Sequence, residues 1–203
     1  MNRSTGHVLV WDRFVRFFHW SLVIGFTTAY CYTEPSDCVH QGAGYLALGL
    51  IAARTVWGFI ATRPYARFEC VVPSPSRLRH HLSRLVRGHA PRHLGHSPAG
   101  AVLILFLLAA TLFIGVTGFL ITTDPLRDNE LVETLHVGAV DVTVIAVLLH
   151  VAAILCGSFR HRENLLTAMF TGYKRDYGTQ ERTCSTGHDS RLDPHRPTHP
   201  NEV

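Results

Sequence analysis

The sequence lacks several features that are typical of soluble or metal-binding proteins. Only 17% of its 203 residues are charged, whereas 47% are hydrophobic. No Cys-X-X-Cys pair occurs among its cysteines, which are Cys31, Cys38, Cys70, Cys156 and Cys184. This excludes a zinc ribbon and covalent attachment of c-type haem at such a pair. Cys31 and Cys38 flank a short loop and could pair in an oxidising compartment, but we interpret them as two unrelated thiols.

No small-residue cleavage site follows the first apolar run of the chain. Arg13 and Arg16 lie close to this run, and the residues after it are Tyr30, Cys31 and Tyr32. A secretory signal would place small residues there. We therefore expect a retained first helix.

The apolar residues are concentrated in four stretches, at 14–32, 39–61, 100–122 and 131–159. Each is close to the about 20 residues that a helix needs to cross about 30 Å of hydrocarbon. The stretch 100–122 contains no charged residue. The other stretches carry ionisable side chains, which is also compatible with buried core helices, but four such runs in one short chain favour membrane spans. The sequence thus predicts an all-α, multi-pass integral membrane protein that forms a four-helix bundle.

Basic residues are distributed unevenly over the predicted connections. The segment 62–97 holds seven arginines against one acidic residue, Glu69. The loop 33–37 has two acids and no base, and the loop 123–130 has three acids against Arg127. Because cytoplasmic loops retain Lys and Arg, both termini and the long basic loop are predicted to be cytoplasmic, with the bundle in the cell inner membrane.

An amphipathic helix is predicted within the long basic loop. Leu78, Leu82, Leu85 and Val86 recur at helical spacing among arginines. This pattern is typical of a helix that lies at the lipid headgroups. A nucleic-acid-binding function is not expected, since no aromatic stacking platform accompanies the arginines and the whole chain carries a net charge of only +4.

The C-terminal end of the chain is polar and rich in proline. We expect residues 1–175 to form one transmembrane domain and residues 176–203 a disordered cytoplasmic tail. The tail histidines His188, His195 and His199 are interpreted as solvated residues and not as metal ligands.

Four histidines lie inside the predicted spans: His19, His40, His136 and His150. Ionisable groups in spanning helices are costly and usually mark function. Any one of them could instead make a hydrogen bond between helices. Fourteen residues separate His136 from His150, which corresponds to about 21 Å along a helix and a rotation that returns to within about 40°. The two histidines therefore share one face of the last span.

The predicted orientation sorts these histidines into two levels. His40 and His136 lie near the periplasmic face, and His19 and His150 near the cytoplasmic face. Each pair comes from two helices, as bis-imidazole ligation of a haem requires. Zinc would need ligands that converge on one point, which two separated levels cannot supply. The residues thus predict two haems, one at each level.

Several motifs occur in order on these spans. They are Arg-Phe-Phe-His-Trp at 16–20, His-Gln-Gly-Ala-Gly-Tyr at 40–45, Arg-Thr-Val-Trp-Gly-Phe at 54–59 and Gly-His-Ser-Pro-Ala-Gly at 95–100, followed by the two histidines of the last span. Through them the stretch 10–175 resembles the bacterial cytochrome b561 and nickel-iron hydrogenase b-type cytochrome family. The resemblance implies a membrane cytochrome that binds two haem b non-covalently and exchanges electrons with quinone or a partner protein. The ligand histidines of the family correspond here to His19, His40, His136 and His150.

Other polar residues receive alternative interpretations. Arg54 can neutralise a haem propionate at the cytoplasmic level or extend to the headgroups. Asp141, about 140° around the helix from His136, is expected to face away from the haem side and to accept a proton near a quinone or pair with another helix. His96 is interpreted as an interfacial structural residue. Several glycines near the histidines leave room for a macrocycle or for helix packing; these are Gly42, Gly44, Gly49, Gly115 and Gly118.

The leading functional hypothesis is an electron conduit, an electron-transfer oxidoreductase component between the quinone pool and a redox partner. One alternative is a periplasm-facing oxidoreductase that acts on a small oxidant such as superoxide. Another is a haem-bearing anchor that docks a hydrogenase or a c-type cytochrome through its acidic periplasmic loops. A haem-free helical transporter is a further class and predicts no visible chromophore.

Overall fold

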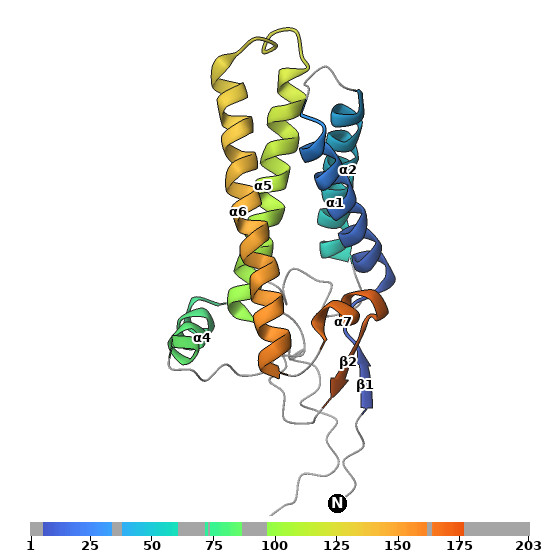
Figure 1. The fold of residues 1–203 in the computed structure, drawn as a ribbon, viewed down its shortest axis with the longest axis vertical. Helices are drawn as coiled ribbons and strands as arrows, with labels where there is room; N and C mark the ends of the chain where they lie inside the picture. Colours follow the sequence, from blue (N-terminus) through green and yellow to red (C-terminus); the bar gives the residue numbers. More distant parts are fainter. Residues whose placement is uncertain are drawn as a thin grey trace, which may run out of the picture.

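The computed structural model describes residues 6–33, 38–60, 72, 74–86, 97–161 and 164–176. Four long helices run alongside one another (Figure 1): α1 (Arg13–Cys31), α2 (Cys38–Ile60), α5 (Pro98–Ile121) and α6 (Glu130–His161). Two short helices and two short strands lie at one end of them: α4 (Pro75–Val86), α7 (Leu165–Thr171), β1 (Gly6–Leu9) and β2 (Tyr173–Asp176). The described part of the chain is therefore predominantly helical.

The long helices coincide with the four apolar stretches of the sequence, with each boundary shifted by at most two residues. Three of them are long and apolar enough to cross a membrane: Cys38–Ile60, Pro98–Ile121 and Glu130–Arg160. The first helix, α1, is not among these three. Arg16 and His19 lie within it and lower its mean hydropathy. Length and composition thus support three of the four predicted spans.

Side-chain caps set where several helices begin. Asp12 precedes α1, and its carboxylate accepts a hydrogen bond of 2.7 Å from the backbone N–H of Val15. Ser97 caps α5 in the same way, accepting from the N–H of Gly100 at 3.2 Å. Asn129 accepts from two N–H groups of the first turn of α6. Each cap satisfies a backbone donor that has no partner within the helix.

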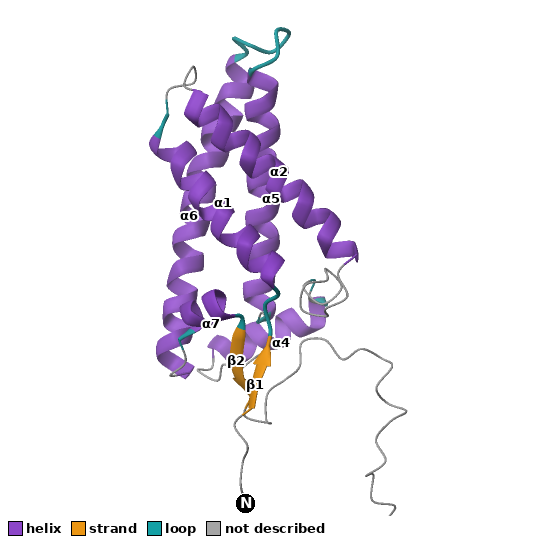
Figure 2. Cartoon of the chain, turned by 90° about the vertical axis from the view of Figure 1, so that its right-hand side faces the viewer, coloured by secondary structure: helices purple, strands orange, loops and turns teal. Residues whose placement is uncertain are grey.

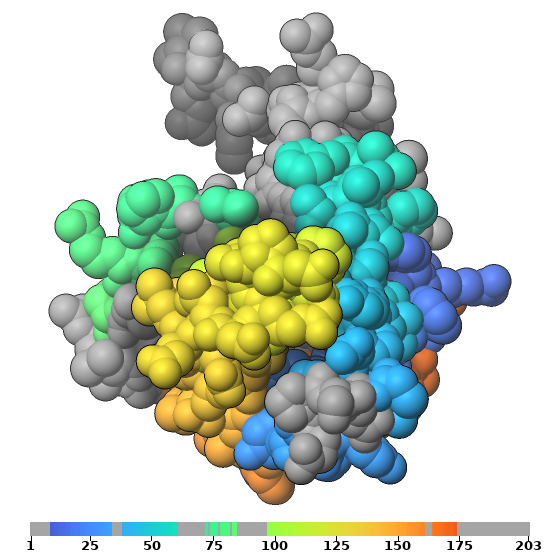
Figure 3. Space-filling model, turned by 90° about the horizontal axis from the view of Figure 1, so that it is seen from above, coloured from blue at the N-terminus to red at the C-terminus, as the bar shows by residue number. Residues whose placement is uncertain are grey.

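Helices α1 and α2 form one antiparallel pair, and α5 and α6 form a second pair. The two pairs join where α2 packs against α5. Gly115 of α5 makes this approach possible, because a Cβ atom there would lie 3.0 Å from Leu48 of α2. Seen from above, the connection between α5 and α6 (yellow) lies beside the start of α2 (blue) at one end of the molecule (Figure 3).

The opposite end is organised by a small sheet and two short helices. β1 pairs with β2 in antiparallel register, with Leu9 opposite Tyr173. Figure 2 shows the sheet at the base of the long helices, with α7 beside it. The sequence did not predict α7 or the sheet, and β2 continues to Asp176, one residue beyond the predicted domain boundary. The rest of the predicted tail lies outside the described residues.

Helix α4 confirms the helix that the sequence predicts within the basic loop. It spans Pro75–Val86 and packs against α5. Arg79 and His80 are exposed, whereas His81 is buried. Of the segment 62–97, the structure describes residues 72, 74–86 and 97, so His96 lies outside the described residues.

Candidate functional site

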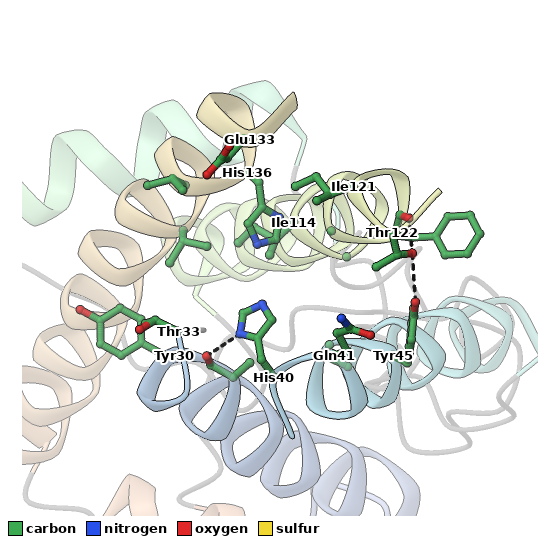
Figure 4. A pocket seen from close by; sticks show the side chains of 18 of the residues that line it. Tyr30, Thr33, His40, Gln41, Tyr45, Ile114, Ile121, Thr122, Glu133 and His136 are labelled. Atoms are coloured by element: carbon green, nitrogen blue, oxygen red, sulfur yellow. Dashed lines mark hydrogen bonds between the residues drawn. The ribbon is translucent and has the colours of Figure 1, made fainter. Parts of the chain in front are cut away.

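The four predicted histidines lie at two levels of the helical assembly. His40 is in the first turn of α2 and His136 in the second turn of α6, so both are near the end that carries the α5–α6 connection. Their ring centroids are 6.3 Å apart, and the ring planes are inclined by 68°. Figure 4 shows the two imidazoles facing each other across a gap between α2 and α6. We call this pair the upper level.

Thr117 of α5 fixes the orientation of the His136 ring. Its hydroxyl oxygen lies 3.0 Å from His136 Nδ1, and also 2.9 Å and 3.1 Å from the carbonyl oxygens of Phe113 and Ile114. The single hydroxyl proton is donated to a carbonyl of α5, so the oxygen accepts from Nδ1–H of the imidazole. This tautomer leaves the Nε2 lone pair of His136 available for a ligand.

Backbone carbonyls orient the His40 ring in a similar way. His40 Nδ1 lies 2.9 Å from the carbonyl oxygen of Ala29 and 2.8 Å from that of Tyr32. A carbonyl oxygen only accepts, so Nδ1 carries the proton and Nε2 is unprotonated in the neutral ring. Both carbonyls belong to the C-terminal end of α1. The end of one helix thus positions a side chain on the next.

A cavity of about 880 Å³ lies at the upper level. All four long helices contribute to its wall, and side chains from the α5–α6 connection border it. This volume is within the about 300–1,000 Å³ typical of cofactor sites. A Cβ atom at Gly44, which lines the cavity, would meet nothing within 4 Å. A larger side chain at Gly44 would therefore occupy cavity space. Tyr45 and Thr122 join α2 and α5 at the rim through a hydrogen bond of 3.1 Å (Figure 4).

Gly118 of α5 leaves room for the imidazole of His136. A Cβ atom at this position would lie 3.0 Å from Cε1 of the His136 ring. In contrast, Gly42 and Gly49 face open space. Of the glycines that the sequence suggested, Gly44 and Gly118 are thus tied to the cavity and its histidine, and Gly115 to the packing of α2 on α5.

His19 of α1 and His150 of α6 form the lower level. The two imidazoles are close enough to interact electrostatically. His19 Nδ1 is buried and has no hydrogen-bond partner among the described residues. The ring contacts Trp20 edge to face at a centroid distance of 5.2 Å, and Trp20 stacks on Phe170 of α7 at 4.3 Å. Aromatic packing therefore orients His19.

Arg54 of α2 is buried, with 7% of its surface exposed. Its guanidinium is therefore not extended to the surface, and it lies close enough to Asp12 for electrostatic attraction. Asp12 also accepts a hydrogen bond of 3.2 Å from Trp57 Nε1 of α2. The carboxylate that caps α1 thus links α1 to α2 near the lower level.

Asp141 requires a correction to the expectation from helical periodicity. Its side chain is exposed, as expected for the outer side of α6, yet it borders the same cavity as His136. The cavity wall extends around α6 through Val137 and Val140 to Asp141. The interpretation that Asp141 faces away from this site is therefore wrong.

The sequence interpretation missed the residues that orient the histidines, above all Thr117, Trp20 and Phe170. A threonine in an otherwise apolar helix is a weak signal, since Thr111 of the same helix makes a similar bond to its own helix backbone, at 2.8 Å from the carbonyl oxygen of Leu107. Only the tertiary structure shows that one of these hydroxyls meets a histidine.

Comparison with known proteins assigns the chain to a family. Residues 10–172 match the family model described as prokaryotic cytochrome b561, which covers about four-fifths of the chain. The chain belongs to the prokaryotic cytochrome b561 family. No curated protein and no solved structure matches it. Membership makes the protein a membrane b-type cytochrome, which binds b-type haem and transfers electrons to a redox partner.

The upper level of this cytochrome fits a haem. Metal–imidazole bonds are about 2 Å long, so two rings on opposite sides of one iron have centroids roughly 6 Å apart. The observed separation of 6.3 Å agrees with this value, and both Nδ1 atoms are already hydrogen-bonded. Among the described residues, no group of three or more His, Cys, Asp or Glu side chains is placed to hold a bare metal ion. Paired imidazoles beside a cavity match haem better than zinc.

Proposed function

We propose that this cytochrome holds two haems b and transfers electrons between the quinone pool and a redox partner. His40 and His136 would ligate one haem, and His19 and His150 the other. The observation that carries the proposal is the upper histidine pair, with opposed rings 6.3 Å apart beside a cavity and Nδ1 protons already engaged. A hydrogen bond on the second ring nitrogen is the usual support of a metal-bound histidine.

Helix α6 supports two separate levels. It is continuous from Glu130 to His161, so His136 and His150 are about 21 Å apart along its axis. Between them, Thr143 and Ala146 are buried on the inner face of the helix. When bound, each haem supplies one-electron redox chemistry, whereas the protein sets its potential through ligands, burial and nearby charge. Described neighbours orient the imidazoles of His19, His40 and His136.

The membrane arrangement that we propose is a four-helix bundle with both termini in the cytoplasm. Helix α1 would be the fourth span, since it lies alongside the three helices that are apolar enough to cross. The pairing of β1 with β2 places the segments before α1 and after α7 at the same end. The arginine-rich segment 62–97 supports a cytoplasmic location of that end, in a cell with an inner membrane.

Helix α4 would then lie at the cytoplasmic headgroups. Its exposed residues include Arg79 and His80, and its sequence has no acidic residue. Cationic side chains near the membrane surface are attracted to anionic lipids. Membrane lipid is thus a partner of this helix.

The opposite, periplasmic end presents acidic side chains to a partner. Asp124, Asp128, Glu130 and Glu133 are exposed in the α5–α6 connection and the first turn of α6, and Arg127 pairs with Asp124 at 3.5 Å. Such a surface suits a basic redox protein, such as a c-type cytochrome or a hydrogenase-like subunit. Asp128 and Glu133 also border the cavity, so the partner surface would adjoin the upper haem.

Haem content tests this proposal. The protein is purified in detergent, and haem per chain is measured together with the reduced-minus-oxidised spectrum. Two low-spin b haems per chain are expected. A single haem would refute the two-level assignment.

A further inference from the structure

The two levels differ in how their histidines are held, and this difference leads to a further residue. At the upper level, both rings are oriented by hydrogen bonds at Nδ1. At the lower level, His19 Nδ1 is buried without such a bond in the described part of the chain. An imidazole that lacks a hydrogen bond must be oriented by packing. The residues that pack around the His19 ring therefore have the orienting role that Thr117 has at the upper level.

Trp20 and Phe170 supply this packing. Trp20 follows His19 in α1, and its indole meets the imidazole at right angles, with centroids 5.2 Å apart. The Phe170 ring stacks on the same indole at 4.3 Å and 23°. Stacked and edge-to-face contacts at these distances are the favoured geometries of aromatic pairs. The three rings thus form one continuous contact from α7 to His19.

A second contact holds Phe170 against α1. The Arg16 guanidinium donates a hydrogen bond to the backbone carbonyl of Phe170. This carbonyl lies in the last turn of α7, where carbonyl oxygens have no N–H donor within the helix and favour a cation. Arg16 is one turn before Trp20 on the same side of α1. The side chain of Phe170 contacts Trp20 and its backbone carbonyl contacts Arg16, so both contacts are made to one face of α1.

Helix α7 is in turn fixed at both ends. Its first residue, Leu165, donates its N–H to Ser158 of α6 at 3.3 Å. Gly172 ends it in the left-handed conformation, with φ 87°, and its carbonyl accepts from the N–H groups of Val10 and Trp11 at 2.9 Å and 3.1 Å. A Cβ atom on Gly172 would lie 2.7 Å from the Trp11 carbonyl oxygen, so glycine is required here. The helix is anchored to α6 and to the segment before α1.

We propose that Phe170 is a positioning residue for the lower haem: its ring holds Trp20, and Trp20 holds the His19 imidazole in the orientation that binds iron. This inference rests on the proposed role of His19 as a ligand. It gives α7, the last helix in the described part of the chain, a function in orienting a ligand of the lower haem. Residues that orient a metal-bound histidine from behind change metal affinity by about 10–100-fold when they are replaced.

The central test is Phe170→Leu, which keeps an apolar side chain but removes the ring that stacks on Trp20. We expect about a tenfold weaker binding of the lower haem and a changed low-spin electron paramagnetic resonance signal of that haem. The signal of the upper haem stays as in the original protein. Phe170→Tyr retains the ring, so the signal of the lower haem is expected to match that of the original protein. Phe159→Leu, at an α6 position that is 81% exposed, is the matched control and leaves both signals unchanged.

Two further variants assign the signals and separate this inference from the proposed function. His19→Ala removes the lower signal and His136→Ala the upper one. If His19→Ala leaves both haems bound, the ligand assignment is wrong. If His19→Ala removes one haem but Phe170→Leu alters neither signal, the positioning role is overturned while the ligand assignment stands. If Phe170→Leu loses both haems, the variant Arg16→Gln tests the positioning role instead. It removes only the contact to the α7 carbonyl and is expected to shift the signal of the lower haem alone.

Discussion

The upper and lower levels solve the same problem, the orientation of an imidazole inside apolar helices, by different means. The upper level uses acceptors that the helices already carry: two carbonyls at the end of α1 and a threonine hydroxyl on α5. The lower level uses ring contacts that extend to a helix more than 140 residues along the chain from His19. Hydrogen bonds select a tautomer as well as an orientation, whereas packing selects orientation alone. The two haems that we propose should therefore respond to different substitutions.

The largest effect is expected from removal of an upper ligand. His136→Ala removes one of the two proposed imidazole ligands that line the cavity. The upper haem should therefore be lost while the lower haem remains. Haem per chain, measured by absorbance of the reduced protein, is expected to fall to half. His150→Ala should cause an equal loss at the other level, and removal of the same haem by both variants would contradict the pairing.

Loss of the Thr117 hydroxyl is expected to weaken the upper haem alone. Thr117→Val keeps the shape of the side chain but leaves the His136 Nδ1 proton without its acceptor, in a residue that is only 5% exposed. A decrease in haem affinity of about 10–100-fold is expected. Haem titration of the apoprotein measures it. Thr143→Val is the control, since the Thr143 hydroxyl bonds the carbonyl of Ala139 in its own helix and Thr143 does not line the cavity.

A smaller effect is expected from Gly118→Ala. The added Cβ atom would lie 3.0 Å from the His136 ring and force it to move by a few tenths of an ångström. The electron paramagnetic resonance signal of the upper haem should shift while both haems stay bound. Gly49→Ala, where a Cβ atom meets nothing within 4 Å, serves as the comparison. An identical response of the two variants would argue against close contact between α5 and the ring.

The smallest effect on the haems themselves is expected from Asp141→Asn. Asp141 borders the upper cavity but lies five residues beyond His136 on a different side of α6, so the spectrum of both haems should be unchanged. If Asp141 accepts a proton from quinol at this cavity, reduction by quinol slows by about a hundredfold or more. Stopped-flow reduction with a soluble quinol measures this rate. An unchanged rate would leave Asp141 outside the path of the proton.

The sequence predicted those parts of the fold and site that depend on local pattern. Runs of apolar residues located the four long helices, and helical periodicity placed His136 and His150 on one face of α6. Features that depend on contacts distant along the chain were not predicted. Nothing near Thr117 or His40 in sequence indicates which acceptor meets an imidazole, because that is decided by how α5 packs on α6 and how α1 ends beside α2.

Two further differences have the same origin. Four-residue strands with no apolar alternation carry little signal, so the pairing of β1 with β2 was missed. Asp141 was assigned by the angle of its helix position alone, but a cavity between helices is wide enough to reach around α6. The periodicity of a single helix does not predict the shape of a cavity that is lined by four helices.

The pairing of β1 with β2 and the anchoring of Gly172 to Val10 and Trp11 also constrain the order of assembly. Among the described elements, β1 is synthesised first and β2 last, with all four long helices in between. The contacts between Gly172 and the segment before α1 therefore cannot form until residue 172 has left the ribosome. The upper level, with its cavity wall, needs residues only up to Asp141 of α6, so it can be completed earlier. Haem insertion into the nascent protein is then expected to begin at the upper level and to end at the lower one.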